Sequence, residues 1–290
     1  EYVKVELNEN PGFIHENINT IKTWIASEPH LNAHPDDQWI LTFLRGSKYS
    51  LEKTKRKIEY HYRVRSLIPE LYSNRNLSSP EMKEFLDKKI FLPLDINKNG
   101  PQFGLFRFNV DDIDHLPLLT LAKSSIMLGQ IVLRENDYLL KGGSVIIDYK
   151  GMKLSRATEI TFGQLKIILT LKQAYPVRLD RIFLLNCPIP VSKANEIMNI
   201  ILNKKLRSKI HLCPEETDLL KIVPSSILPK EYGGEACLKK IAAYWKQRVE
   251  ENKDWFEKDA TYGIDETKEN QVTSNELFGT QGSFRKLQLD

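Results

Sequence analysis

Two short segments near the middle of the chain consist almost wholly of apolar residues, and they constrain the fold more than any other feature. They are Val145–Ile147, within SVIIDYKG, and Ile182–Leu185, within RIFLLNCP. A continuous apolar run of this length is typical of a strand that is covered on both faces. Other segments alternate with these two strands, namely helical patterns at 158–174, 191–206 and 215–222 and short strands at 104–109 and 210–213. This alternation predicts an α/β sheet between residues 104 and 222.

The N-terminal part of the chain has only helical patterns. A stripe of isoleucines predicts a helix over 13–28, and Pro29 ends it. A second helix, 36–46, starts at two aspartates, which favour a helix N-terminus electrostatically. Ser50 is placed to cap a third helix, 51–66, whose outer face is basic. We therefore expect a small three-helix domain with a basic surface.

Three further helices and a tail complete the prediction. We expect a short helix near 80–87, a very apolar helix over 115–140 and a final helix over 238–258. After Asp259 the chain is polar and rich in turn residues, which indicates a loosely docked tail. The expected division is an N-terminal helical domain (1–85), a central α/β domain (86–236) and a C-terminal helix with its tail (237–290).

Composition and cysteine content favour a cytoplasmic protein. The 290 residues carry a net charge of +4, which is too small for general binding to polyanions. The three cysteines are odd in number and widely spaced, which argues against a disulfide framework. The first ten residues are acidic and polar, so we expect no signal peptide there. The most apolar long stretch, 116–133, is too polar for a membrane span.

Several short motifs, taken in order, resemble the CRAL-TRIO lipid-binding family. They are FLRG at 43–46, SVIIDYKG at 144–151, AYP at 174–176, RIFLLNCP at 181–188 and LPKEYGG at 228–234. The resemblance covers about residues 13–258 and is strongest to the animal branch that carries tocopherol and retinaldehyde. The ending GSFRKLQLD is similar to the tails of insect members of that branch.

The resemblance implies a specific architecture and ligand site. A helical N-terminal domain would precede a mixed five-stranded sheet whose one face, with several helices, encloses an apolar cavity. A mobile amphipathic helix at about 191–206 would close that cavity as a lid. By alignment, the cavity-lining residues would be Ser125, Gly129, Val145, Ile147, Ile167, Leu171, Tyr175, Ile182 and Leu184, with Ile197, Met198, Ile201 and Leu202 from the lid. Ser125 could then orient a ligand hydroxyl or aldehyde.

The same resemblance implies a cationic patch that binds phosphoinositide headgroups beside the lid. Arg178, Lys205 and Lys209 align with basic positions of that patch, and Lys48 lies next to a position where this chain has Ser47. Each lysine or arginine near an anionic leaflet contributes about 1 kcal/mol, so a few would give weak, reversible docking. The expected partners are one hydrophobic ligand and a phosphoinositide-containing membrane surface, bound peripherally by a monomer.

Two other classes of function stay open at this stage. Cys187 follows a buried strand and His211 lies on a neighbouring one, so a thiol nucleophile is conceivable, although a cysteine there is usually a packed apolar residue. The sequence has no GxGxxG, P-loop, GxSxG or HExxH motif and no metal-ligand spacing among its histidines. We therefore expect no enzyme, no cofactor and no metal site. The third class is a phosphoinositide-binding regulatory module without a transport ligand.

Overall fold

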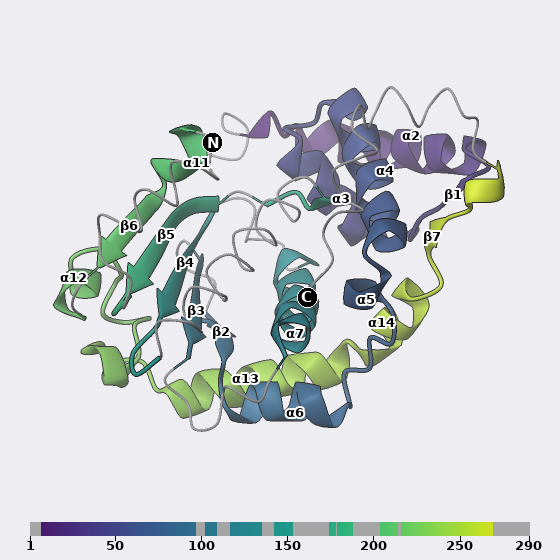
Figure 1. Cartoon of the computed structure of the whole chain (residues 1–290). Helices are drawn as coiled ribbons and strands as arrows, with labels where there is room; N and C mark the ends of the chain where they lie inside the picture. The colour runs from purple at the N-terminus through teal and green to yellow at the C-terminus, as the bar shows by residue number, and fades with distance from the viewer. Residues whose placement is uncertain are drawn as a thin grey trace. The chain divides into compact units, whose positions relative to one another are not determined.

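The computed structural model describes residues 7–96, 102–108, 117–134, 142–152, 174–177, 179–187, 204–213 and 216–268 (Figure 1). The chain divides into two compact units. One contains residues 1–74, 173–175 and 258–290, and we call it the helical unit. The other contains residues 75–172 and 176–257, and we call it the sheet unit. The chain therefore passes from one unit to the other several times, which a simple N-to-C division does not anticipate.

The helical unit contains the three predicted N-terminal helices. They are α2 (Ile14–Ser27), α3 (Asp37–Gly46) and α4 (Leu51–Leu67), flanked by η1 (Pro11–Phe13) and the single turn α5 (Pro69–Tyr72). The Asp36 carboxylate caps α3 by accepting the Trp39 amide at 2.7 Å, as the sequence suggested. Ser50 is the N-cap residue of α4, but its side chain makes no capping hydrogen bond. Apolar side chains from all three helices, including Ile21, Phe43 and Tyr62, form the core of this unit.

The C-terminal segment up to Lys268 is a built part of the helical unit, which corrects the expectation of a loosely docked tail after Asp259. Strand β7 (Gly263–Ile264) pairs antiparallel with β1 (Leu31–Asn32). The amide of Asp265 donates to the carbonyl of His30 at 2.8 Å, and η4 (Glu266–Lys268) follows. Arg65 of α4 donates to the Asp259 carboxylate at 2.7 Å. We call residues 259–268 the C-terminal strap.

The sheet unit is built on the predicted mixed five-stranded sheet, with strand order β2-β3-β4-β5-β6. Strand β2 pairs antiparallel with β3, and the other neighbours are parallel. The strands are β2 (Phe91–Pro93), β3 (Gln102–Arg107), β4 (Gly143–Asp148), β5 (Leu179–Leu185) and β6 (Ile210–Cys213). Four of them match predicted strands. Strand β2 has no recognisable sequence pattern, because it is three residues long and ends in a proline.

Helices of the sheet unit differ from prediction mainly at their ends. They are α6 (Pro80–Asp87), α7 (Leu118–Arg134), α11 (Lys204–Arg207), α12 (Thr217–Leu220), α13 (Leu238–Glu251) and α14 (Lys253–Asp259), with the turn η3 (Lys230–Tyr232). The helix predicted over 238–258 is interrupted at Asn252, which separates α13 from α14. In Figure 1, α13 runs along the base of the unit beside α6, and it also contacts α7 and β2. The indole of Trp245 on α13 donates to the Pro93 carbonyl at 2.7 Å and ties the helix to the sheet.

Candidate functional site

One face of the five-stranded sheet has two adjacent rows made only of apolar residues, and it is the candidate binding surface. The register places Gly104, Val145, Ile182 and Ile210 in one row across β3 to β6 and Phe106, Ile147, Leu184 and Leu212 in the next. Paired residues of neighbouring strands point to the same side of a sheet, so these eight share a face, which we call the apolar face. Ile147, Ile182 and Leu184 are at most 6% exposed, whereas Val145, Phe106, Ile210 and Leu212 are only half-buried. Apolar side chains therefore border accessible space on this side.

The opposite face, which we call the closed face, is packed and locked by polar contacts. Leu105, Ile146 and Phe183 form one of its rows and are at most 1% exposed. In the following row the fully buried Asp148 carboxylate accepts hydrogen bonds from the Tyr232 hydroxyl at 2.7 Å and the Asn186 amide at 2.9 Å. Burial, followed by the nearby Asp148 charge, raises the pKa of Tyr232. The EYGG motif thus fastens to the carboxyl ends of the strands on the side away from the apolar face.

Helix α7 has a gap in its surface at the predicted ligand positions Ser125 and Gly129. Both residues are half-buried and lie one helical turn apart. Among the described residues, apart from the backbone of α7 itself, no atom lies within 4 Å of a Cβ placed on Gly129. The Ser125 hydroxyl donates to the Leu121 carbonyl at 2.6 Å, so its proton is used within the helix. The oxygen keeps its lone pairs, and Ser125 can therefore accept a hydrogen bond more readily than it can donate one.

The structure brings together four of the predicted cavity residues and places others elsewhere. Val145, Ile147, Ile182 and Leu184 are neighbours on the apolar face. Gly104, Phe106, Ile210 and Leu212 belong to the same face and were not predicted, although alternation along the strands 104–109 and 210–213 could have indicated them. The predicted positions Ile167, Leu171, Ile197, Met198, Ile201, Leu202 and Arg178 lie outside the described residues.

Tyr175, another predicted cavity residue, lies in the helical unit. Its ring packs edge-on against His61 at a centroid distance of 4.6 Å and against Trp39 at 6.4 Å. Its carbonyl accepts a hydrogen bond from the Lys57 ammonium at 3.2 Å. The AYP motif therefore holds the chain against α3 and α4 just before β5 begins.

The predicted phosphoinositide residues occupy different surroundings. Lys209 is half-buried, and its ammonium donates to the Leu179 carbonyl at the start of β5. Lys205 lies on α11 beside the exposed Lys204. Lys48 is exposed in the helical unit, in a turn where both it and Tyr49 have positive φ angles of 53° and 57°. Because non-glycine residues pay for this conformation, the turn must be held by its neighbours.

The Arg45 guanidinium of the FLRG motif supplies that support. It donates to Glu9 at 2.7 and 3.0 Å, and the Tyr49 hydroxyl donates to the same carboxylate at 2.7 Å. Burial raises the pKa of Glu9, but the hydrogen bonds from Arg45 and Tyr49 outweigh it and bring the pKa below its ordinary value. The motif thus anchors the start of the chain and fixes the turn that carries Lys48.

His211 and Cys187, the residues considered for catalysis, lie on neighbouring strands or just beyond them. His211 is exposed on β6, and its ring stacks on Phe183 at a centroid distance of 5.4 Å. Cys187 is half-buried beyond the end of β5. Over the described part of the chain, His, Cys, Asp and Glu form no group that could hold a metal ion. The described helices also include none with the length and apolar character needed to cross a bilayer.

An apolar, partly exposed sheet face, backed by a packed opposite face, is the kind of surface that a lipid-binding α/β domain presents. Comparison with known families agrees: residues 86–234 match the CRAL/TRIO domain model, and residues 10–82 match the model of the Pinta-like UBA domain. The chain belongs to the CRAL/TRIO family, whose members bind and transfer hydrophobic lipids.

Individual relatives support the same assignment. Clavesin-1 of Xenopus laevis is 23% identical over 80% of this chain and 71% of its own length. Clavesin-2 of Homo sapiens is 24% identical over 81% of this chain and 73% of its own. Among solved structures, that of Sfh5 superposes with a TM-score of 0.53 at 12% identity, covering 85% of this chain and 99% of Sfh5. The similarity to Sfh5 concerns the fold alone.

Proposed function

We propose that this protein binds one small hydrophobic ligand, of the size and character of a tocopherol, retinoid or carotenoid, and carries it between membranes without changing it chemically. The observation that carries the proposal is the apolar face: two complete rows without a polar side chain, half-exposed at Val145 and Phe106. Burying about 500 Å² of apolar ligand surface contributes on the order of 12 kcal/mol before ordering costs, enough for tight binding.

The hydrogen-bonding state of Ser125 favours an alcohol over an aldehyde as the ligand. An alcohol can donate its proton to Ser125 Oγ while that hydroxyl keeps its bond to Leu121. An aldehyde has only acceptor atoms, so it would compete with Leu121 for the serine proton. The direct test is mass spectrometry and an absorbance spectrum of lipid extracted from the purified protein. One stoichiometric isoprenoid alcohol supports the proposal, and a protein that purifies and stays stable without lipid contradicts it.

Replacement of Gly129 by leucine tests whether the open space beside α7 belongs to the ligand. The Cβ of the new side chain meets no atom of the described residues outside α7 within 4 Å. Replacing glycine inside a helix also stabilises the helix by about 0.5–1 kcal/mol. Gly129→Leu should therefore keep or raise the melting temperature while lowering affinity for the extracted ligand at least tenfold. Gly263→Leu is the matched control, because a Cβ there also meets nothing within 4 Å but lies on β7 of the helical unit. Equal affinities of both variants would exclude a ligand at Gly129.

We also propose that release is promoted at phosphoinositide-containing membranes through the basic run that begins at α11. Lys204→Glu with Lys205→Glu should slow ligand transfer to phosphoinositide vesicles several-fold and leave ligand affinity unchanged. Lys239→Glu with Lys240→Glu, on the exposed start of α13, makes the same change in net charge and serves as the control. If both double variants transfer at the wild-type rate, the proposed membrane contact is wrong.

A further inference from the structure

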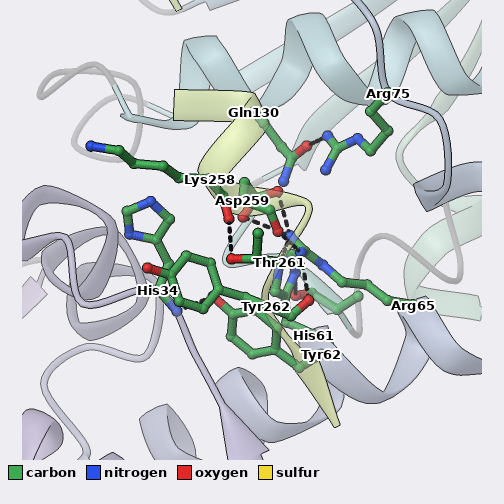
Figure 2. Close-up of polar contacts among 11 residues, drawn as sticks. His34, His61, Tyr62, Arg65, Arg75, Gln130, Lys258, Asp259, Thr261 and Tyr262 are labelled. Atoms are coloured by element: carbon green, nitrogen blue, oxygen red, sulfur yellow. Dashed lines mark hydrogen bonds and ion pairs between the residues drawn. The ribbon is translucent and has the colours of Figure 1, made fainter. Parts of the chain in front are cut away.

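A buried chain of hydrogen bonds links α4 to the Ala174–Tyr175 segment and to the C-terminal strap. His61 Nδ1 lies 3.2 Å from the Ala174 carbonyl oxygen, and its Nε2 lies 3.1 Å from an Arg65 nitrogen. Arg65 in turn donates to both Asp259 carboxylate oxygens, at 2.9 and 2.7 Å (Figure 2). His61 and Asp259 are both 0% exposed. The three side chains therefore form one solvent-excluded series inside the helical unit.

Its contacts with Arg65 and Ala174 determine which nitrogen of His61 carries the proton. A guanidinium has only N–H donors, so His61 Nε2 must accept the bond from Arg65. A backbone carbonyl only accepts, so His61 Nδ1 must carry the hydrogen that Ala174 binds. The imidazole is thus neutral with its single proton on Nδ1. A second proton, on Nε2, would remove the acceptor and leave two cations 3.1 Å apart in a buried site.

Several of the groups that pack against His61 are uncharged rings. From α3, the uncharged rings of Trp39 and Phe43 face it, each at a centroid distance of 5.5 Å. From the 174–177 segment the phenol of Tyr175 packs against it. On α4 itself, Tyr62 and Arg65 are its neighbours, and the Lys57 ammonium lies one turn away on the Tyr175 carbonyl. The nearby carboxylate, Asp259 of α14, is already engaged by Arg65.

We propose that His61 is a proton-sensitive latch, whose protonation frees the Ala174–Tyr175 segment and weakens binding of the hydrophobic ligand. This inference rests on the proposed function. The chain leaves Tyr175 and enters β5 at Leu179, and β5 contributes Ile182 and Leu184 to the apolar face. Breaking the His61–Ala174 hydrogen bond therefore releases the chain just before β5, a strand that we expect to border the ligand. Acidic conditions would favour unloading.

The direction and size of the effect follow from proton linkage. The neutral imidazole is the bonded form, so the latch is fully closed above about pH 6.5, where a free histidine is neutral. Below that pH the opened form takes up a proton that the closed form excludes. The closed-to-open ratio then falls by up to about tenfold for each pH unit.

The test compares the pH dependence of ligand affinity in three full-length proteins: wild type, His61→Gln and His15→Gln. Glutamine can donate to Ala174 and accept from Arg65 but does not titrate, and His15 is an exposed histidine on α2. With fluorescently labelled tocopherol as probe, the Kd of wild type and His15→Gln should rise by up to about fivefold between pH 6.5 and 5.5, while that of His61→Gln stays constant. A wild-type Kd that is constant, or an equal rise in His61→Gln, would overturn the latch.

A second measurement separates failure of the latch from failure of the proposed function. If no probe binds at pH 7.5, the carrier proposal fails for that ligand class. The latch is then read in wild type by hydrogen exchange of the Ala174, Tyr175 and Val177 amides. Their protection factors, taken against the intrinsic exchange rate at each pH, should fall below pH 6.5 before those of α2 do. Protection factors that fall equally in both regions would reject the latch, and the same measurement decides the matter if His61→Gln does not fold.

Discussion

The two faces of the sheet are formed by neighbouring residues of the same strands, but they differ in burial and in polar contacts. On β4, Ile146 is completely buried on the closed face, whereas its neighbour Val145 is half-exposed on the apolar face. The closed face also carries the buried Asp148, which Tyr232 and Asn186 satisfy. The apolar face has no polar group that could be left without a partner. A sheet can thus keep one partly exposed apolar face when the packing on its opposite face stabilises the same strands.

The largest test of this contrast truncates one phenylalanine on each face. Phe183 is 1% exposed on the closed face, so Phe183→Ala should lower the free energy of unfolding by about 3–5 kcal/mol. Phe106 is half-buried on the apolar face and stacks on Phe91 at 4.3 Å, so Phe106→Ala should cost only about 1–2 kcal/mol. Denaturant titration of the lipid-free proteins measures both. Similar losses would mean that both faces are equally packed.

The next test enlarges the adjacent residues Ile146 and Val145 to tryptophan. Ile146→Trp overfills a packed site and should cost about 1–3 kcal/mol or more. Val145→Trp should alter stability by less than about 1 kcal/mol, because the new ring extends toward accessible space. It should nevertheless reduce the lipid that copurifies, as quantified by mass spectrometry of extracts. A Val145→Trp protein that unfolds as readily as Ile146→Trp would remove the distinction between the faces.

The smallest expected effect concerns the Tyr232 hydroxyl, which donates a hydrogen bond to Asp148 on the closed face. Tyr232→Phe removes one hydrogen bond to Asp148 and should cost about 1–2 kcal/mol. The raised pKa of Tyr232 means that its neutral form is the stabilising one. Its contribution is complete below about pH 10, where a free tyrosine ionises, and declines as the pH rises further. Thermal unfolding between pH 8 and 11 should show a steeper alkaline decline in wild type than in Tyr232→Phe.

Local patterns in the sequence account for most of the sheet and for half of the apolar face. The runs around Ile146 and Phe183 are apolar and bounded by turns, so the sequence predicts both strands. The family resemblance then predicts that they belong to a mixed five-stranded sheet. The interruption at Asn252 has no comparable signal, because the apolar spacing continues from Trp245 to Trp255. Residues 260–268 look polar and unstructured for another reason. What orders them is the pairing of Asp259 with Arg65, which lies 194 positions away.

That distant pairing has a consequence for how the protein is made. During synthesis helix α4, which contains Arg65, leaves the ribosome 194 residues before Asp259, whose carboxylate neutralises this buried cation. A buried guanidinium without its counter-charge is strongly destabilising. Helices α2 to α4 therefore lack this ion pair while the whole sheet is being translated, and a segment made before the sheet completes its packing only after it.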